Sequence, residues 1–189
     1  MQPLVQIHQA PFLQHMRDLG VDVRFVLYDL LPITMPQHFP AGAQDNHTRW
    51  VRVAASTDGV ICISRAVADE FNAWLAQHAS ADVPPKVDWF HMGADIQSSK
   101  PTLGLPADAA LTLQALSALP TFLVVGTLEP RKGHAQVLDA MEQLWQTGVQ
   151  ANLAIVGKQG WAVDQLVARL KAHPKSGSQL FWFEGVSDE

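Results

Sequence analysis

Short apolar runs alternate with amphipathic stretches along the whole chain, and this alternation predicts an α/β fold. We predict strands at residues 21–28, 59–64, 86–92, 121–126, 152–156 and 179–183. Apolar residues three or four positions apart predict helices at 10–19, 45–57, 106–119 and 132–147, and also after Ser64 and after Gly160. The near-continuous apolar run at 23–27 is typical of a parallel strand that is buried on both faces. In such a sheet, ligands bind beyond the carboxyl ends of the strands.

Composition narrows the class of protein only slightly. The chain has 189 residues, of which 48% are hydrophobic, and a formal net charge of −5. Neither half has the excess of basic residues that nucleic acid or an anionic membrane surface requires. The single cysteine, Cys62, cannot form an internal disulfide and is predicted to be a buried strand residue. No stretch is long enough to span a bilayer and no signal peptide is visible, so we expect a cytoplasmic protein.

The most informative segment is Thr-Phe-Leu-Val-Val-Gly-Thr-Leu-Glu-Pro-Arg-Lys-Gly at 121–133. The predicted strand ends at Gly126, and a short loop delivers Arg131 and Lys132 to the predicted start of a helix. Backbone N–H groups and the helix dipole at such a point attract an anion, and the side chains add full charges. Cations at a helix N-terminus oppose the dipole, so this pair indicates a bound phosphate. The spacing is not that of a P-loop, because Gly133 follows Lys132.

Three further positions are candidates with two interpretations each. Glu129 either orients Arg131 or is an acid that the helix dipole favours. The stretch 157–161 repeats the strand-glycine-helix arrangement, and its glycines either admit a ligand or end the strand for steric reasons. Asp29, which follows the strand at 21–28, either binds a sugar hydroxyl or caps the next turn. No cluster of His, Cys and Asp has metal-ligand spacing, and no nucleophile elbow is present.

These motifs together resemble the GT-B glycosyltransferases of family four, a family that contains many mannosyltransferases. The segment 121–133 is similar to the family's nucleotide-sugar loop. Three other stretches resemble family segments: Val-Leu-Tyr-Asp-Leu-Leu-Pro at 26–32, Gly-Val-Ile-Cys-Ile-Ser with the helix that follows, and Ile-Val-Gly-Lys-Gln-Gly-Trp at 155–161. Two positions depart from the family: Thr127 stands where many relatives have Arg, and Tyr28 stands where many have His.

The resemblance implies parts of two Rossmann-like domains with parallel sheets. Residues 1–97 would be the end of the acceptor domain, 98–119 a linker, and 120–189 the start of the nucleotide-sugar domain. Arg131 and Lys132 would stabilise the departing diphosphate. The donor would also contact a larger set of residues, namely Gly126, Thr127, Glu129, Gly157, Lys158, Val186 and Ser187, and Asp29 would lie on the acceptor side.

The resemblance also implies a retaining transfer of a hexose such as mannose, with a nucleotide-diphosphate sugar as donor and no metal or other cofactor. The acceptor would be a glycan or a lipid-linked glycan, which allows peripheral association with the inner face of the membrane. The family's two glutamates seven residues apart would lie beyond Glu189, so we expect a fragment that is inactive alone. Two alternatives stay open: a non-catalytic nucleotide- or anion-binding α/β module, and a GT-B sugar-nucleotide epimerase.

Overall fold

The computed structural model describes residues 10–78, 84–93 and 107–186. They belong to two compact units, residues 1–94 and 95–189, and each unit has a three-stranded parallel sheet. Strand order follows the sequence, β1-β2-β3 in unit 1 and β4-β5-β6 in unit 2. Parallel neighbours in sequence order need a helical crossover between them, which is what the alternating pattern predicts. The predicted α/β class with parallel sheets is confirmed.

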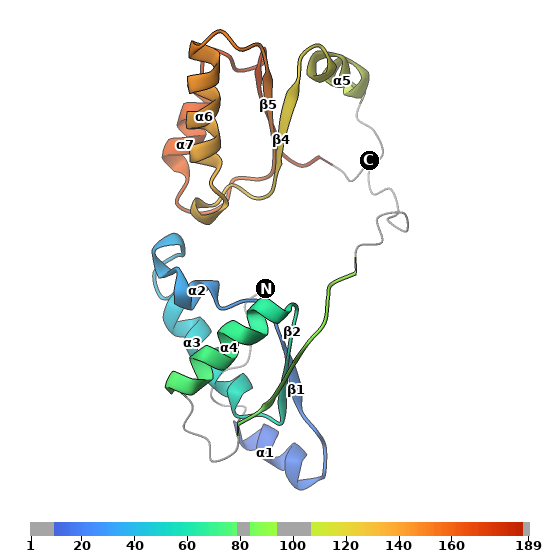
Figure 1. Ribbon diagram of the computed structural model, residues 1–189, viewed down its shortest axis with the longest axis vertical. Coiled ribbons are helices and arrows are strands. Elements are labelled where there is room, and N and C mark those ends of the chain that lie inside the picture. Colours follow the sequence, from blue (N-terminus) through green and yellow to red (C-terminus); the bar gives the residue numbers. More distant parts are fainter. Residues whose placement is uncertain (1–9, 79–83, 94–106, 187–189) are drawn as a thin grey trace. The chain divides into compact units, whose positions relative to one another are not determined.

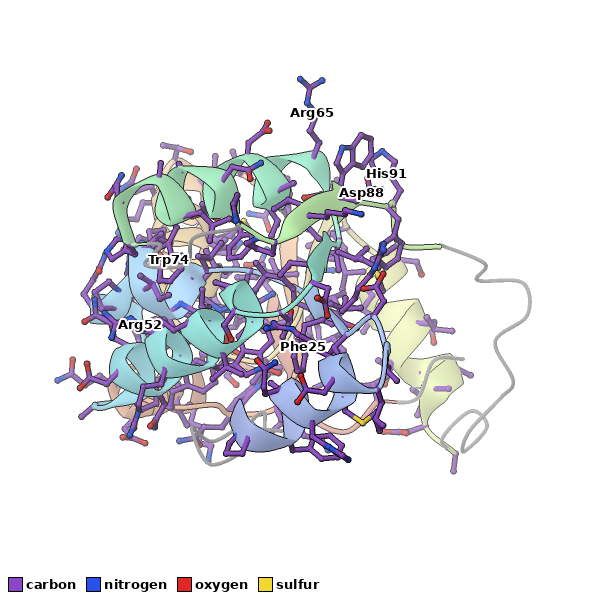
Figure 2. All side chains as sticks on the ribbon, turned by 90° about the horizontal axis from the view of Figure 1, so that it is seen from below. Phe25, Arg52, Arg65, Trp74, Asp88 and His91 are labelled. Atoms are coloured by element: carbon purple, nitrogen blue, oxygen red, sulfur yellow. The ribbon has the colours of Figure 1, made fainter. Side chains whose placement is uncertain are left out.

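Unit 1 packs helices α3 (Ala43–Ala55) and α4 (Arg65–His78) against one face of its sheet (Figure 1). Its elements are α1 (Ala10–Asp18), β1 (Arg24–Leu27), α2 (Leu31–Thr34), η2 (Pro36–His38), α3 (Ala43–Ala55), β2 (Gly59–Cys62), α4 (Arg65–His78) and β3 (Lys86–Trp89). The core joins strand residues such as Leu27 and Val60 to Val51 of α3 and Phe71 of α4. Arg65, at the start of α4, points away from this body (Figure 2).

Several local predictions for unit 1 are confirmed. Ser64 Oγ accepts the N–H of Val67 at 3.2 Å and so caps α4. Cys62 is fully buried in β2, and burial raises the pKa of its thiol to about 11.

The prediction that the first strand is buried on both faces is wrong, because Val26 and Tyr28 are 43% and 59% exposed. Within the described residues, the two helices cover only one face of β1, and alternate side chains point away from them.

Unit 2 has helices on both faces of its sheet (Figure 1). Its elements are α5 (Ala109–Ser117), β4 (Thr121–Val125), η3 (Pro130–Lys132), α6 (His134–Gln146), β5 (Asn152–Val156), α7 (Asp164–Ala172) and β6 (Leu180–Phe183). Helices α6 and α7 lie on one face, and α5 lies on the other. The central strand β5 is almost wholly buried, whereas the edge strand β4 exposes Phe122, Leu123 and Val125.

Helix α5 occupies part of the stretch interpreted as a linker, 98–119. The side-chain amide of Asn152 donates to the carbonyls of Ala115 and Leu116 at 3.2 Å, which ties the end of α5 to the start of β5. The structure therefore joins this helix to the second sheet by hydrogen bonds. None of the described helices is long and apolar enough to span a bilayer.

Candidate anion site at the carboxyl edge of the second sheet

The carboxyl ends of β4, β5 and β6 carry three loops that hydrogen bonds hold together. We refer to residues 126–133 as the β4 loop and to 157–161 as the β5 loop. Leu128 donates its N–H to the carbonyl of Lys158 at 2.9 Å, and Gly160 donates back to the carbonyl of Leu128 at 3.0 Å. The β6 end joins them, since Glu184 Oε1 accepts the N–H of Gln159 at 3.2 Å. The sheet thus extends past its strands into the loops that the sequence singles out.

Two glycines of the β5 loop are explained by the β4 loop that faces them. A Cβ at Gly157 would lie 2.0 Å from the carbonyl oxygen of Gly126, and one at Gly160 would lie 2.5 Å from that of Leu128. No larger residue fits either position without moving backbone. Gly126 itself has φ of 145°, a conformation that side-chain-bearing residues rarely adopt. The glycines therefore let two loops touch, which the sequence could not distinguish from close approach to a ligand.

The predicted place of Arg131 and Lys132 at the start of a long helix is wrong in detail. They lie in η3, and Gly133 follows with φ of 73° as the N-cap of α6. A residue in the left-handed conformation breaks the helical path, so the cations precede the helix by one turn of 3-10 geometry. Helix α6 begins at His134, and its first-turn N–H groups have no intrahelical acceptor.

Arg131 and Lys132 differ in their electrostatic surroundings. Arg131 Nε lies 2.9 Å from Glu129 Oε2, in a pair whose geometry makes no hydrogen bond between these atoms. The Glu129 side chain is 9% exposed and that of Arg131 is 27% exposed, so the carboxylate compensates most of the guanidinium charge. Of the two interpretations of Glu129, this contact corresponds to the one in which it orients Arg131.

Lys132 and Lys158 are exposed, and no carboxylate of the described residues lies within the 4.0 Å of an ion pair with either. Thr127 is also exposed, between Gly126 and the buried Leu128. Two lysines without an ion-pair partner among the described residues therefore belong to adjoining loops, and one of these loops leads into α6. This combination favours an anion with several negative oxygens.

The remaining predicted positions lie elsewhere or outside the described residues. Val186 is 54% exposed after β6, and Ser187 lies outside the described residues. Asp29 belongs to unit 1, where Oδ1 accepts the N–H of Leu31 at 3.1 Å in the turn that leads into α2. That bond corresponds to the interpretation in which Asp29 caps the next turn. Among the residues described, no three His, Cys, Asp or Glu side chains gather as a metal site would require.

His134 is a residue that the sequence reasoning missed. It is 1% exposed, and neither ring nitrogen has a hydrogen-bond partner of normal geometry within the described part of the chain. A signal was present: the buried residues of α6 are His134, Leu138, Met141 and Trp145, a regular stripe that begins at the histidine. Extending the apolar stripe by one turn toward the N-terminus would have placed this imidazole in the core.

Comparison with known proteins identifies a family whose match includes the β4 and β5 loops. Residues 114–189 match the family "Glycosyl transferases group 1". Two sequences of the serotype-specific mannosyltransferase WbdA of Escherichia coli are each 43% identical to this chain over 178 residues. These matches cover 92% of the chain but only 22% and 21% of those relatives. The chain thus spans about a fifth of the length of the curated relatives it matches.

Solved structures of low sequence identity share the fold. The α,α-trehalose 6-phosphate synthase of Burkholderia multivorans superimposes with a TM-score of 0.59 at 17% identity, over 95% of this chain and 44% of that one. The UDP-forming enzyme of Burkholderia xenovorans gives 0.56 at 16% identity, over 95% and 46%. At this identity the likeness concerns the fold alone, namely parallel α/β sheets in two units.

Proposed function

We propose that the chain forms part of a retaining hexosyltransferase, because its residues 114–189 match the group 1 glycosyltransferases and its mannosyltransferase relatives are 43% identical to it. Unit 2 would bind the diphosphate of a nucleotide sugar, and unit 1 would belong to the acceptor side. The observation that carries the proposal is the pair of uncompensated lysines, Lys132 and Lys158, on loops that hydrogen bonds hold at the carboxyl edge of the sheet.

Charge development explains why those lysines would matter. When the bond between the anomeric carbon and the diphosphate oxygen breaks, negative charge builds on the diphosphate. Fixed cations and first-turn N–H groups stabilise that charge more than they stabilise the ground state. Lys132 would supply the cation. Arg131, held by Glu129, would supply a guanidinium of fixed direction, and Thr127 and Lys158 would close the same edge.

The sugar and the acceptor follow from the relatives only as proposals. We propose mannose as the transferred hexose, because the curated relatives are mannosyltransferases. The acceptor would be a glycan or a lipid-linked glycan, and Asp29 would face it from unit 1 through the carboxylate oxygen that does not accept the N–H of Leu31. No metal enters this scheme, because the lysines and the helix start supply the positive charge.

Calorimetric titration of the full chain with pyrophosphate, GDP and UDP tests the diphosphate site. We expect binding of all three, and the tighter nucleotide identifies the donor base. Lys132→Ala should weaken each affinity by about tenfold, equivalent to about 1.4 kcal/mol. EDTA should leave the affinities unchanged.

Lys175→Ala is the matched control. Lys175 lies over the ring of Trp145, which belongs to the last turn of α6, at the opposite end of that helix from His134. Its removal takes away the same charge from unit 2 and should not change diphosphate binding. Equal losses in the two variants would show that the affinity follows net charge and not this site, and the absence of any binding would refute the proposal.

A further inference from the structure

His134 is a buried residue that directly follows the β4 loop in the chain. It is the first residue of α6, it follows Lys132 and Gly133, and it is 1% exposed. The groups that act on its ring electrostatically or by hydrogen bonding are the backbone of Gly126, the Lys132 ammonium and the Glu129 carboxylate. These groups span the β4 loop from its hinge at Gly126 to its cation. The imidazole is therefore in contact with the loop that we propose to hold the diphosphate.

The ring is buried without the partners that buried polar groups normally have. Neither Nδ1 nor Nε2 makes a hydrogen bond of normal geometry within the described residues. The Gly126 backbone raises the pKa of the ring, as a hydrogen-bond acceptor does. The contact nevertheless lacks the geometry of a normal hydrogen bond. A hydrogen bond of normal geometry between the ring and Gly126 therefore requires the loop or the ring to move.

Near neutral pH the imidazole is uncharged. Burial lowers the pKa of His134 and the Lys132 charge acts in the same direction, against the Gly126 backbone and Glu129. A neutral imidazole has one N–H donor and one acceptor nitrogen. It can therefore hold a backbone group without adding a third positive charge to Arg131 and Lys132.

Gly126 is the point at which such a bond would control the loop. Its N–H is fixed to the carbonyl of Val156 at 2.9 Å, its φ is 145°, and its carbonyl lies against Gly157. The peptide that follows Gly126 sets the direction of the Thr127 N–H group, whereas the Leu128 N–H is already donated to the carbonyl of Lys158. A side chain that fixes this peptide therefore fixes the Thr127 N–H and the start of the β4 loop.

We propose that His134 is a positioning residue: when a diphosphate binds to the β4 loop, the neutral imidazole closes a hydrogen bond with the Gly126 backbone and holds the loop in its binding conformation. This inference rests on the proposed function and adds to it the residue that orders the loop. It also explains a polar residue in the apolar stripe of α6, where Leu would pack without an unpaired nitrogen.

Variants of His134 in the full chain test the inference, with pyrophosphate as the probe at about pH 7.5, where the ring is neutral. His134→Leu should keep or raise the thermal midpoint, because it removes unpaired buried nitrogens, and yet weaken pyrophosphate binding by about fivefold or more. Asn presents an amide near the position of Nδ1, and Gln presents one near Nε2. One of His134→Asn and His134→Gln should restore the affinity to within about twofold.

His173→Leu is the control for loss of an imidazole from the same unit. His173 follows α7, and its Nε2 lies 3.3 Å from Glu142 Oε1. This variant should bind pyrophosphate as the wild type does. A second readout needs no variant: the ring ¹⁵N resonances of His134 in the wild-type chain should shift on saturation with pyrophosphate, while those of His173 should not.

Each outcome is decisive. Wild-type affinity in His134→Leu, a loss that neither amide restores, or unchanged His134 resonances would overturn the positioning role and leave a packing role. If Lys132→Ala loses binding while His134→Leu does not, only this inference fails. If the wild-type chain binds no pyrophosphate, the proposed function fails and this inference fails with it.

Discussion

Burial decides the strength of the contact between Glu129 and Arg131. Their charged atoms are 2.9 Å apart, and both side chains are largely shielded from water. Removing one partner of a shielded pair leaves a charge with neither water nor a counter-ion. We expect Glu129→Gln to lower the free energy of unfolding by about 1–2 kcal/mol, between the values for exposed and for buried pairs. Urea denaturation followed by tryptophan fluorescence measures this change.

Asp69→Asn is the matched control, since it also converts one acid of an ion pair to its amide. Arg65 and Asp69 are 3.8 Å apart on α4, with side chains 77% and 69% exposed, and Figure 2 shows Arg65 projecting outward. This change should cost less than about 0.5 kcal/mol. If the two variants lose equal stability, shielding does not govern the pair at Glu129.

At single positions, the sequence indicated which residues form the candidate site better than it indicated how they are placed. The strand, the glycine and the two cations of 121–133 are visible as a pattern, so the candidate loop could be found. The left-handed Gly133 that separates Lys132 from α6 could not, because glycine also ends strands and caps helices. The burial of His134 was missed although the apolar stripe of α6 indicates it, because a histidine beside charged residues is usually a surface residue.

The contact between the β4 and β5 loops predicts that a larger residue at Gly157 is destabilising. A methyl group at Gly157 would lie 2.0 Å from the Gly126 carbonyl, so Gly157→Ala must separate the loops. We expect a loss of about 1–3 kcal/mol in unfolding free energy, as for other overpacked sites. Pyrophosphate affinity should fall by about tenfold, because the displaced carbonyl belongs to the loop that we propose to bind the anion. Denaturation and calorimetry measure the two effects.

Gly93→Ala is the control for a glycine that has room. No atom lies within 4 Å of a Cβ at Gly93, and its φ is not positive, so the change should leave stability and pyrophosphate binding unaltered. If Gly157→Ala is equally silent, the two loops do not need their close contact, and the glycine must be explained otherwise.

The helices and strands of this fold could be predicted from the spacing of apolar residues and from the glycines and prolines that end each segment. The strand at 152–156 matches β5 without any shift, and the stripe of α7 was found, because central elements are apolar in a regular way. The short helices α2 and η2 were missed, since four or three residues are too few to show a period. Exposure of β4 was missed because an edge strand has the same apolar composition as a central one.

The whole molecule consists of two units with separate cores, 1–94 and 95–189, and the anion site that we propose draws its described residues from the second alone. A ligand that binds only the folded form stabilises the unit that it contacts, by about 2.7 kcal/mol at a hundredfold excess over its dissociation constant. Hydrogen exchange of the full chain should therefore slow in peptides from 121–186 on addition of pyrophosphate. Peptides from 10–78 and 84–93 should exchange at unchanged rates.

Lys132→Ala, measured at the same pyrophosphate concentration, should lose most of this protection, which separates site binding from a general effect of the salt. Protection that also reached unit 1 in the wild type, and disappeared in Lys132→Ala, would contradict a diphosphate site confined to unit 2. That pattern would mean that unit 1 supplies part of the anion site or is stabilised by its occupation. Asp29, whose carboxylate accepts the N–H of Leu31 with one oxygen and has a second, would then be the first residue to substitute.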